Sequence, residues 1–182
     1  IETLILSENG YDVLLVAPTG GGKTLAGFLP SLNDLINNKP KKNKLHTLYI
    51  SPLKALTIDV HRNLTSPIED QGLDIRVETR TGDTSAYKKN RQKVLPPHML
   101  MTTPESLALL LSNKESKDYF KDLKYLVIDE IHTLVNTKRG DLLSLNLSRI
   151  NSISPDCKKI GLSATVKNKN ACLLYTSPSP RD

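Results

Sequence analysis

The amino-acid sequence predicts an α/β fold in which a mostly parallel sheet carries helices on both of its faces. Short apolar runs of strand length alternate with longer runs of helical spacing along most of the chain. The first junction between such a strand and helix contains three consecutive glycines, followed by Lys23 and Thr24. Parallel strands are joined by crossover helices, so the carboxyl ends of the strands, and a ligand site, are expected at one edge of the sheet.

The predicted elements alternate from the start of the chain to its end. We expect strands at residues 13–16, 45–50, 75–79, 98–101, 123–128 and 158–162. We expect helices at residues 23–36, 53–70, 86–94, 104–111 and 142–153. Pro104 suits the first turn of its helix, where a missing N–H leaves no hydrogen bond unmade. The lysine-rich stretch 39–44 is expected to be a solvated loop.

The composition is that of one domain with its own core. The chain has 182 residues, 38% of them hydrophobic, and no apolar run approaches the ~20 residues of a membrane helix. Two cysteines without metal-ligand spacing fit a reducing compartment, so we expect a cytoplasmic protein that does not enter a membrane. The net charge of +6 allows a polyanionic partner without requiring one.

The stretch from Ala17 to Thr24 has the parts of a phosphate-binding loop, although the general pattern begins with Gly where this chain has Ala17. Glycines let backbone N–H groups point inward at phosphate oxygens, and the following helix adds free N–H donors. Lys23 would reach the β- and γ-phosphates of ATP, and the Thr24 hydroxyl would bind Mg²⁺. The alternative is a simple glycine turn, which would not require Lys-Thr after it. The predicted nucleotide-binding residues are Thr19, Gly20, Gly21, Gly22, Lys23 and Thr24.

Asp129 and Glu130 end the most apolar of the predicted strands. Two carboxylates there repel each other and lose solvation, and a Mg²⁺ ion would relieve both costs. We expect Asp129 to share that ion with Thr24, and Glu130 to orient and deprotonate the attacking water. Lys23, Asp129 and Glu130 are thus the candidate catalytic residues. The alternatives are a solvated acidic strand end and, for His132, an ordinary hydrogen-bonded packing residue.

Six motifs stand in a fixed order between residues 12 and 166. They are Ala-Pro-Thr-Gly-Gly-Gly-Lys-Thr (17–24), Ser-Pro-Leu-Lys-Ala-Leu (51–56), Arg-Thr-Gly-Asp-Thr (80–84), Thr-Thr-Pro-Glu-Ser-Leu (102–107), Asp-Glu-Ile-His (129–132) and Ser-Ala-Thr (163–165). This set resembles the motifs of superfamily 2 helicases, in which Ala is usual at the first position of the phosphate loop. The particular residues of these motifs, together with Thr-Lys-Arg-Gly (137–140), are most similar to the large helicase-related (Lhr) family.

The resemblance implies a RecA-like phosphate-loop NTPase domain at residues 1–171, the motor domain of an ATP-dependent helicase. Lhr proteins are 3′–5′ helicases of bacteria and archaea linked to DNA repair. The implied cofactors are ATP and Mg²⁺. The implied partners are single-stranded nucleic acid, DNA rather than RNA, and a second RecA-like domain. Two other function classes stay open: a nucleotide-dependent nucleic-acid-binding switch without unwinding, and a small-molecule phosphate-loop kinase.

The resemblance also gives roles to polar loop residues that spacing alone leaves open. It places the backbone of one nucleic-acid strand on the loops after successive β-strands, where N–H groups and hydroxyls can hold phosphates without reading sequence. Helix capping by Ser51 or Thr103 explains the same residue types, and the two roles are compatible. His132, Ser163 and Thr165 would couple hydrolysis to the strand. The implied nucleic-acid residues are Pro52, Lys54, Thr81, Gly82, Thr103, Pro104, Glu105 and Ser106.

Both ends of the chain are expected to depart from the family pattern. The family has a glutamine-bearing adenine-recognition segment before the phosphate loop, and Ile1 begins downstream of it. Residues 172–182 fit neither helix nor strand and match, at every position, the translation of a transposase-based sequencing adapter. We therefore expect 172–182 to be an artefact outside the fold, with a natural disordered tail as the alternative. The second motor domain is expected to be missing.

Overall fold

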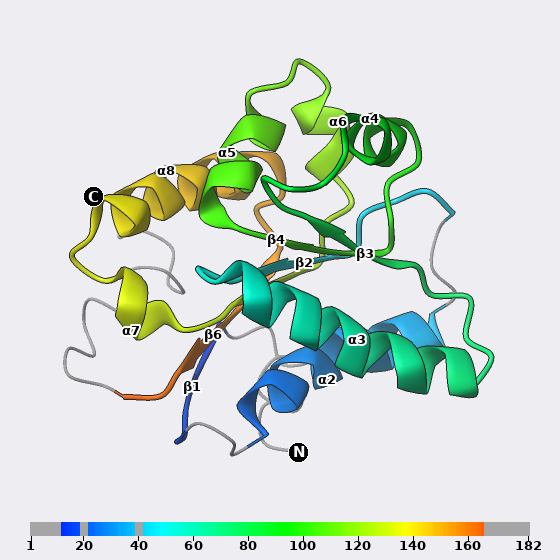
Figure 1. Cartoon of the computed structure of the whole chain (residues 1–182), viewed down its shortest axis with the longest axis horizontal. Helices are drawn as coiled ribbons and strands as arrows, with labels where there is room; N and C mark the ends of the chain where they lie inside the picture. Colours follow the sequence, from blue (N-terminus) through cyan, green and yellow to red (C-terminus); the bar gives the residue numbers. More distant parts are fainter. Residues whose placement is uncertain (1–11, 19–21, 39–41, 166–182) are drawn as a thin grey trace.

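The computed structural model describes residues 12–18, 22–38 and 42–165, and its centre is a six-stranded sheet (Figure 1). Every strand pairing in it is parallel, and the strand order is β1-β6-β5-β2-β4-β3. The predicted parallel α/β fold is confirmed. The strands are β1 (Val13–Val16), β2 (Thr47–Ile50), β3 (Val77–Arg80), β4 (Met99–Thr102), β5 (Tyr125–Ile128) and β6 (Lys158–Ser163).

Helices cover both faces of the sheet (Figure 1). One face carries α2 (Lys23–Asn37) and α3 (Lys54–Asp70). The other carries α5 (Pro104–Leu111), α6 (Ser116–Phe120), α7 (Ile131–Leu134) and α8 (Lys138–Ile153), while α4 (Ala86–Val94) follows the edge strand β3. No helix in the described ranges combines the length and the apolar character that crossing a bilayer requires.

The hydrophobic core lies in two layers, one on each face of the sheet. In β2, Leu48 and Ile50 pack toward α5 and α8, whereas Tyr49 packs toward α2 and α3. This alternation is the period of two that a strand imposes on its side chains. Because both faces are covered, the central strands β2, β4 and β5 are mostly apolar and fully buried, whereas the edge strand β3 carries Glu78, Thr79 and Arg80.

The observed elements differ from the predicted ones at several boundaries. Helices α6 and α7 were not predicted, and the predicted start of α8 at residue 142 was wrong, because α8 begins at Lys138. The hydroxyl of Thr137 accepts a hydrogen bond from the backbone N–H of Gly140 (3.1 Å) and so starts the helix a full turn earlier. Strands β2, β3 and β5 each begin two residues later than expected. Before β2, the N–H groups of His46 and Thr47 share one carbonyl of His98, so the regular ladder starts only at Thr47.

Candidate functional site

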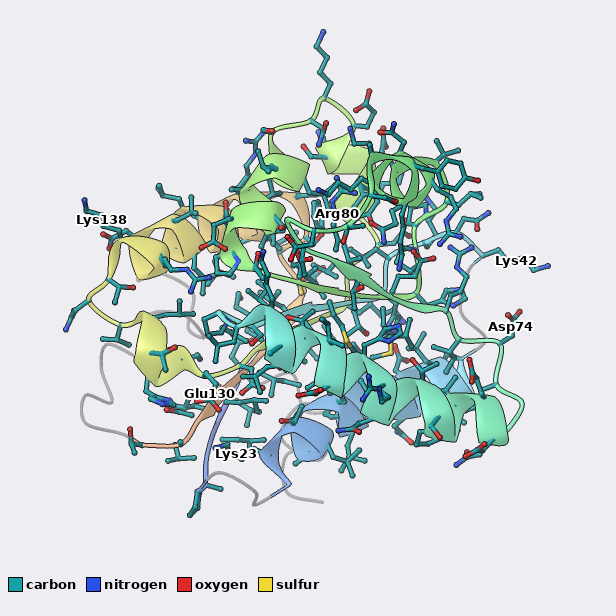
Figure 2. All side chains as sticks on the ribbon, viewed as in Figure 1. Lys23, Lys42, Asp74, Arg80, Glu130 and Lys138 are labelled. Carbon is teal, nitrogen blue, oxygen red and sulfur yellow. The ribbon has the colours of Figure 1, made fainter. Side chains whose placement is uncertain are left out.

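The parallel sheet brings all the predicted motifs to one edge, because each motif follows the carboxyl end of a strand. Along this edge the order is the phosphate loop after β1, residues 163–165 at the end of β6 and residues 129–130 after β5. The candidate nucleic-acid loops follow β2, β4 and β3 in the other half of the sheet. The segment 163–165 therefore lies between the two elements predicted to bind ATP. Figure 2 shows Lys23 and Glu130 at the same end of the molecule, opposite Lys42 and Asp74.

Lys23 opens α2 with a buried side chain that is only 7% exposed. Its ammonium Nζ donates a hydrogen bond to the carbonyl oxygen of Ala17 (2.6 Å), where the chain leaves β1. This bond uses one of three ammonium donors, so the group retains donors for phosphate oxygens. Gly22, directly before it, has a left-handed backbone (φ 70°), which glycine adopts without a steric cost. The predicted phosphate-binding residues Thr19, Gly20 and Gly21 lie outside the described residues.

Asp129 follows β5 directly, and its carboxylate is held by two donors. Oδ2 accepts a hydrogen bond from the hydroxyl of Tyr49 (2.7 Å), and Oδ1 accepts one from the backbone N–H of Glu130 (2.8 Å). Burial, and next the charge of Asp129, raises the pKa of Tyr49 above its ordinary value, so the phenol stays protonated and donates. The ring of Tyr49 stacks on Phe28 of α2 with the ring centroids 5.3 Å apart. The carboxylate is thus positioned by a residue that packs on the helix opened by Lys23.

These residues fit a nucleotide with a bound Mg²⁺. Mg²⁺ prefers oxygen ligands, and Thr24 and Asp129 supply a hydroxyl and a carboxylate. Each oxygen of Asp129 accepts one hydrogen bond, and a carboxylate oxygen has two lone pairs, so each keeps one for a metal. Lys23 supplies the positive charge that the phosphates of such a nucleotide would meet.

His132 connects Glu130 to the segment that follows β6. Its Nε2 lies 3.3 Å from Oε2 of Glu130, and its Nδ1 accepts the backbone N–H of Ala164 (3.3 Å). A backbone N–H can only donate, so Nδ1 of His132 accepts in this contact, and the ring carries a proton on Nε2, the nitrogen near Glu130. The hydroxyl of Ser163 lies 3.2 Å from the same Nδ1 and donates to the carbonyl of Thr165 (2.6 Å). These three predicted coupling residues, His132, Ser163 and Thr165, therefore form one connected group with Glu130.

The structure separates capping from other roles in the candidate nucleic-acid loops. Thr103 caps α5, as predicted, because its Oγ1 accepts the N–H of Ser106 (3.5 Å). The capping role predicted for Ser51 was wrong: its hydroxyl accepts the N–H of Leu53 (3.3 Å), but Leu53 is the residue at the N-cap of α3. Pro104 is buried and lies in the first turn of α5, as its residue type predicts.

Lys54 lies at the start of α3 and is held by the neighbouring loop. Its ammonium contacts both carboxylate oxygens of Asp83 (2.9 and 3.0 Å), which follows Thr81 and Gly82 in the loop after β3. The carbonyl of Gly82 in turn accepts a hydrogen bond from Lys89 (2.9 Å), and the N–H of Thr81 donates to the hydroxyl of Thr84 (2.9 Å). The loops after β2 and β3 are thus joined by an ion pair between exposed side chains.

Tyr49, Asp83 and Arg139 are among the residues that contact predicted site residues and were not assigned a role from the sequence. A tyrosine in a fully buried strand is a signal for Tyr49, because its hydroxyl needs a partner. Asp83 and Arg139 lie inside stretches that carry the family resemblance, but no spacing rule gives their partners. Arg139 contacts both Pro52 and Glu105, which come from two separate loops.

Comparison with known proteins establishes the family. The family model for DEAD/DEAH box helicases matches residues 1–173. The chain belongs to the DEAD/DEAH box helicase family. The ATP-dependent helicase Lhr-Core protein 2 of Thermococcus barophilus is 43% identical to this helicase domain over an alignment of 172 residues, and the alignment covers 87% of this chain and 20% of that protein.

Solved structures of helicases resemble this helicase domain closely. The Mycobacterium smegmatis helicase Lhr bound to ssDNA and AMP-PNP matches with a TM-score of 0.86 and 36% identity, covering 98% of this chain and 24% of that chain. The DEAD-box helicase Mss116 bound to ssRNA and UDP-BeF matches with a TM-score of 0.85 and 25% identity, covering 96% of this chain and 37% of that chain. The predicted RecA-like fold and the resemblance to Lhr helicases are confirmed.

The helicase domain spans about a fifth of the length of the curated Lhr-Core relative it matches. Its family membership decides against a small-molecule kinase, one of the alternatives that the phosphate loop left open.

Proposed function

We propose that this chain is the first motor domain of an ATP-dependent helicase, which couples ATP hydrolysis to movement along single-stranded nucleic acid. The order of strands in the sheet carries this proposal. The candidate ATP residues follow β1 and β5, and the candidate strand-binding segments follow β2, β4 and β3. His132 contacts the segment at the end of β6, which lies between the candidate ATP elements.

In this proposal each polar residue of the ATP half has one task. Lys23, with Thr19, Gly20, Gly21 and Gly22, binds the phosphates of ATP. Mg²⁺ held by Thr24 and Asp129 supplies charge neutralisation on those phosphates. Glu130 accepts the proton of the attacking water, and His132, whose Nε2 lies 3.3 Å from Oε2, orients its carboxylate.

The finer features of the proposal rest on the resemblance to Lhr helicases. From it we propose DNA rather than RNA as the substrate, 3′–5′ movement, a role in DNA repair, a cytoplasmic location and a second RecA-like domain as partner. The binding of ssDNA by the Mycobacterium smegmatis relative supports the choice of DNA. We also propose that the domain covers residues 1–171, a range that lies inside the family match, and that residues 172–182 are an adapter artefact.

The deciding experiment compares Lys23→Ala with Lys42→Ala, a matched change of an exposed lysine at the opposite end of the molecule (Figure 2). Binding of a fluorescent ATP analogue is measured on the 182-residue chain. ATP turnover and strand displacement are measured on the full-length native protein, with and without single-stranded DNA. We expect Lys23→Ala to lose all three activities and Lys42→Ala to keep them.

The outcomes separate the remaining function classes. Turnover that is stimulated by single-stranded DNA and accompanied by strand displacement supports a helicase. Stimulated turnover without displacement indicates the nucleotide-dependent binding switch. Unchanged turnover in Lys23→Ala would overturn the assignment of the phosphate loop.

A further inference from the structure

Arg139 joins two loops that are separate in the sequence. It is the second residue of α8, and its guanidinium makes two parallel contacts with the carboxylate of Glu105, through Nε to Oε1 and through Nη2 to Oε2. The same Nη2 donates to the backbone carbonyl of Pro52 (2.8 Å). Pro52 follows β2 and Glu105 follows β4, and these two strands are neighbours in the sheet.

Only arginine offers this combination of contacts. A planar guanidinium has five N–H donors in a fixed arrangement, so one side chain can hold a carboxylate with two bonds and a carbonyl with a third. The hydrogen bond from Arg139 lowers the pKa of Glu105 below its ordinary value, so this pairing favours the charged carboxylate. A lysine at this position would keep the charge but could not span both partners.

A second contact from the same face of α8 supports the same part of the molecule. Asn146 lies seven residues, or about two helical turns, after Arg139. Its side-chain amide donates to the carbonyl of Pro104 (3.0 Å), next to Glu105, and the side chain is buried. The start of α5 is therefore held against α8 at two points, and Arg139 is the one that also reaches the loop after β2.

We propose that Arg139 is a positioning residue that holds residues 51–54, where β2 leads into α3, and residues 103–106, where β4 leads into α5, at a fixed spacing, so that both segments can contact the phosphates of one strand together. This inference rests on the proposed function. The ion pair with Arg139 also explains why a glutamate, Glu105, lies in a segment predicted to bind phosphates. A free carboxylate there would repel the strand, whereas Glu105 is paired with a cation.

The salt dependence of binding distinguishes positioning from direct contact. For single strands, the logarithm of the affinity falls linearly as the logarithm of the salt concentration rises. The slope of this line is about 0.7 in magnitude for each phosphate contact. A residue that only positions other groups can be removed without lowering this slope. If Arg139 itself contacted a phosphate, its loss would lower the slope by about 0.7.

The experiment measures the anisotropy of a fluorescein-labelled dT oligonucleotide of 12 nucleotides with the full-length native protein over a range of KCl concentrations. The variants are Arg139→Ala, Arg139→Lys and Glu105→Gln, and the control is Arg149→Ala, an exposed arginine on the same helix. We expect Arg139→Ala and Arg139→Lys to weaken binding by roughly tenfold, as for residues of one hydrogen-bonded network, with an unchanged slope. Affinity for the ATP analogue should stay at the wild-type value, because the ATP half is untouched.

Each result has a defined meaning. Wild-type affinity in both Arg139 variants, or a reduced slope in Arg139→Ala with wild-type binding in Arg139→Lys, would overturn the positioning role. If Arg139→Ala does not fold, Arg139→Lys and Glu105→Gln decide the question, and Glu105→Gln should weaken binding in the same direction. Failure of the proposed function itself is distinguishable, because the wild-type protein would then show no salt-dependent binding of the oligonucleotide.

Discussion

Glu130 combines a costly backbone conformation with the position expected of the catalytic base. Its φ of 50° lies in the left-handed region, which costs a residue with a Cβ roughly 1–2 kcal/mol. Such outliers persist where the surroundings determine them, and they gather at functional sites. At Glu130 the surroundings are the hydrogen bond from its N–H to Asp129 and the contact of its side chain with His132. With this conformation the two consecutive acidic side chains contact different residues: Asp129 contacts Tyr49, and Glu130 contacts His132.

Replacing Glu130 with glutamine separates binding from chemistry. Glu130→Gln keeps the size of the side chain and its place beside His132, but it removes the base. We expect ATP to bind with wild-type affinity and turnover in the full-length protein to fall by roughly 10²–10⁴. The measurement is stopped-flow phosphate release, with Glu69→Gln at an exposed position of α3 as the control. Near-normal release from Glu130→Gln would show that another residue activates the water.

The site residues show what a sequence alone can and cannot predict. Lys23, Thr24, Asp129 and Glu130 were predictable because phosphate and metal chemistry restricts residue type and spacing together. Tyr49 and Arg139 were not, since their partners lie 80 and 34 or more residues away in sequence and depend on which strands are neighbours. For His132 the sequence left a packing role and a coupling role open. In the structure Nε2 faces Glu130 and Nδ1 faces Ala164, two contacts that depend on the fold, and the coupling role stays a prediction.

At the scale of the elements, prediction succeeded where periodicity extends over several turns. Helices α4 and α5 begin and end at the predicted residues. Helices α6 and α7 have only five and four residues, too few for a helical period to appear in the sequence. The start of α8 was missed because the deciding hydrogen bond comes from the side chain of Thr137, one residue before the helix.

Helix α2 is fixed at its far end by an ion network that acid should weaken. Asp34 in α2 binds His46 Nε2 (2.7 Å) and Lys124 Nζ (3.0 Å), at the amino ends of β2 and β5. Burial alone raises the pKa of Asp34, but the hydrogen bonds from His46, Lys124 and Asn38 outweigh burial and lower it to about 2, against an ordinary value of 3.8. The charged carboxylate therefore stabilises the fold above pH 4, and this stabilisation is lost as the pH falls from about 4 toward 2.

We expect Asp34→Asn to remove this part of the pH dependence. Urea unfolding of the 182-residue chain between pH 5 and pH 2.5 should show a loss of roughly 1–2 kcal/mol in the wild type that is absent from the variant. Burial lowers the pKa of His46, so the stability lost by protonating His46 is lost as the pH falls below the ordinary value of 6.5. This pH range lies above that of Asp34, so the two effects can be separated. Asp59→Asn, an exposed change on α3, is the control. Parallel curves for wild type and Asp34→Asn would contradict the assignment.

In the proposed function the 182-residue chain is one half of a motor. Three strands of the sheet carry the candidate ATP residues and the coupling segment, and the other three carry the candidate strand-binding loops. In the helicases that it resembles, ATP lies between two such domains, and the second supplies an arginine that stabilises charge on the transferring phosphoryl group. Such an arginine contributes on the order of 10³–10⁵ in rate.

The 182-residue chain by itself should accordingly bind its ligands but not unwind nucleic acid. We expect weak binding of Mg-ATP, hydrolysis barely above background and weak, salt-dependent binding of single-stranded DNA. We expect no strand displacement at any ATP concentration in a gel assay, because unwinding needs two strand-binding domains whose spacing changes. Displacement should appear when the full-length native protein is used. Robust unwinding by a verified monomer of the chain would overturn the half-motor proposal.

The order of the strands also predicts how the sheet opens. Among the described strands, β1 is bonded only to β6 and β3 only to β4, whereas the four inner strands have a neighbour on each side. Strands with a single ladder open more readily, so amide hydrogens of β1 and β3 should exchange with deuterium faster than those of β5 and β2. Both outer strands lead into candidate ligand loops. ATP should therefore slow exchange mainly in β1, and single-stranded DNA mainly in β3, so that mass spectrometry of the two strands reports occupancy of the two sites separately.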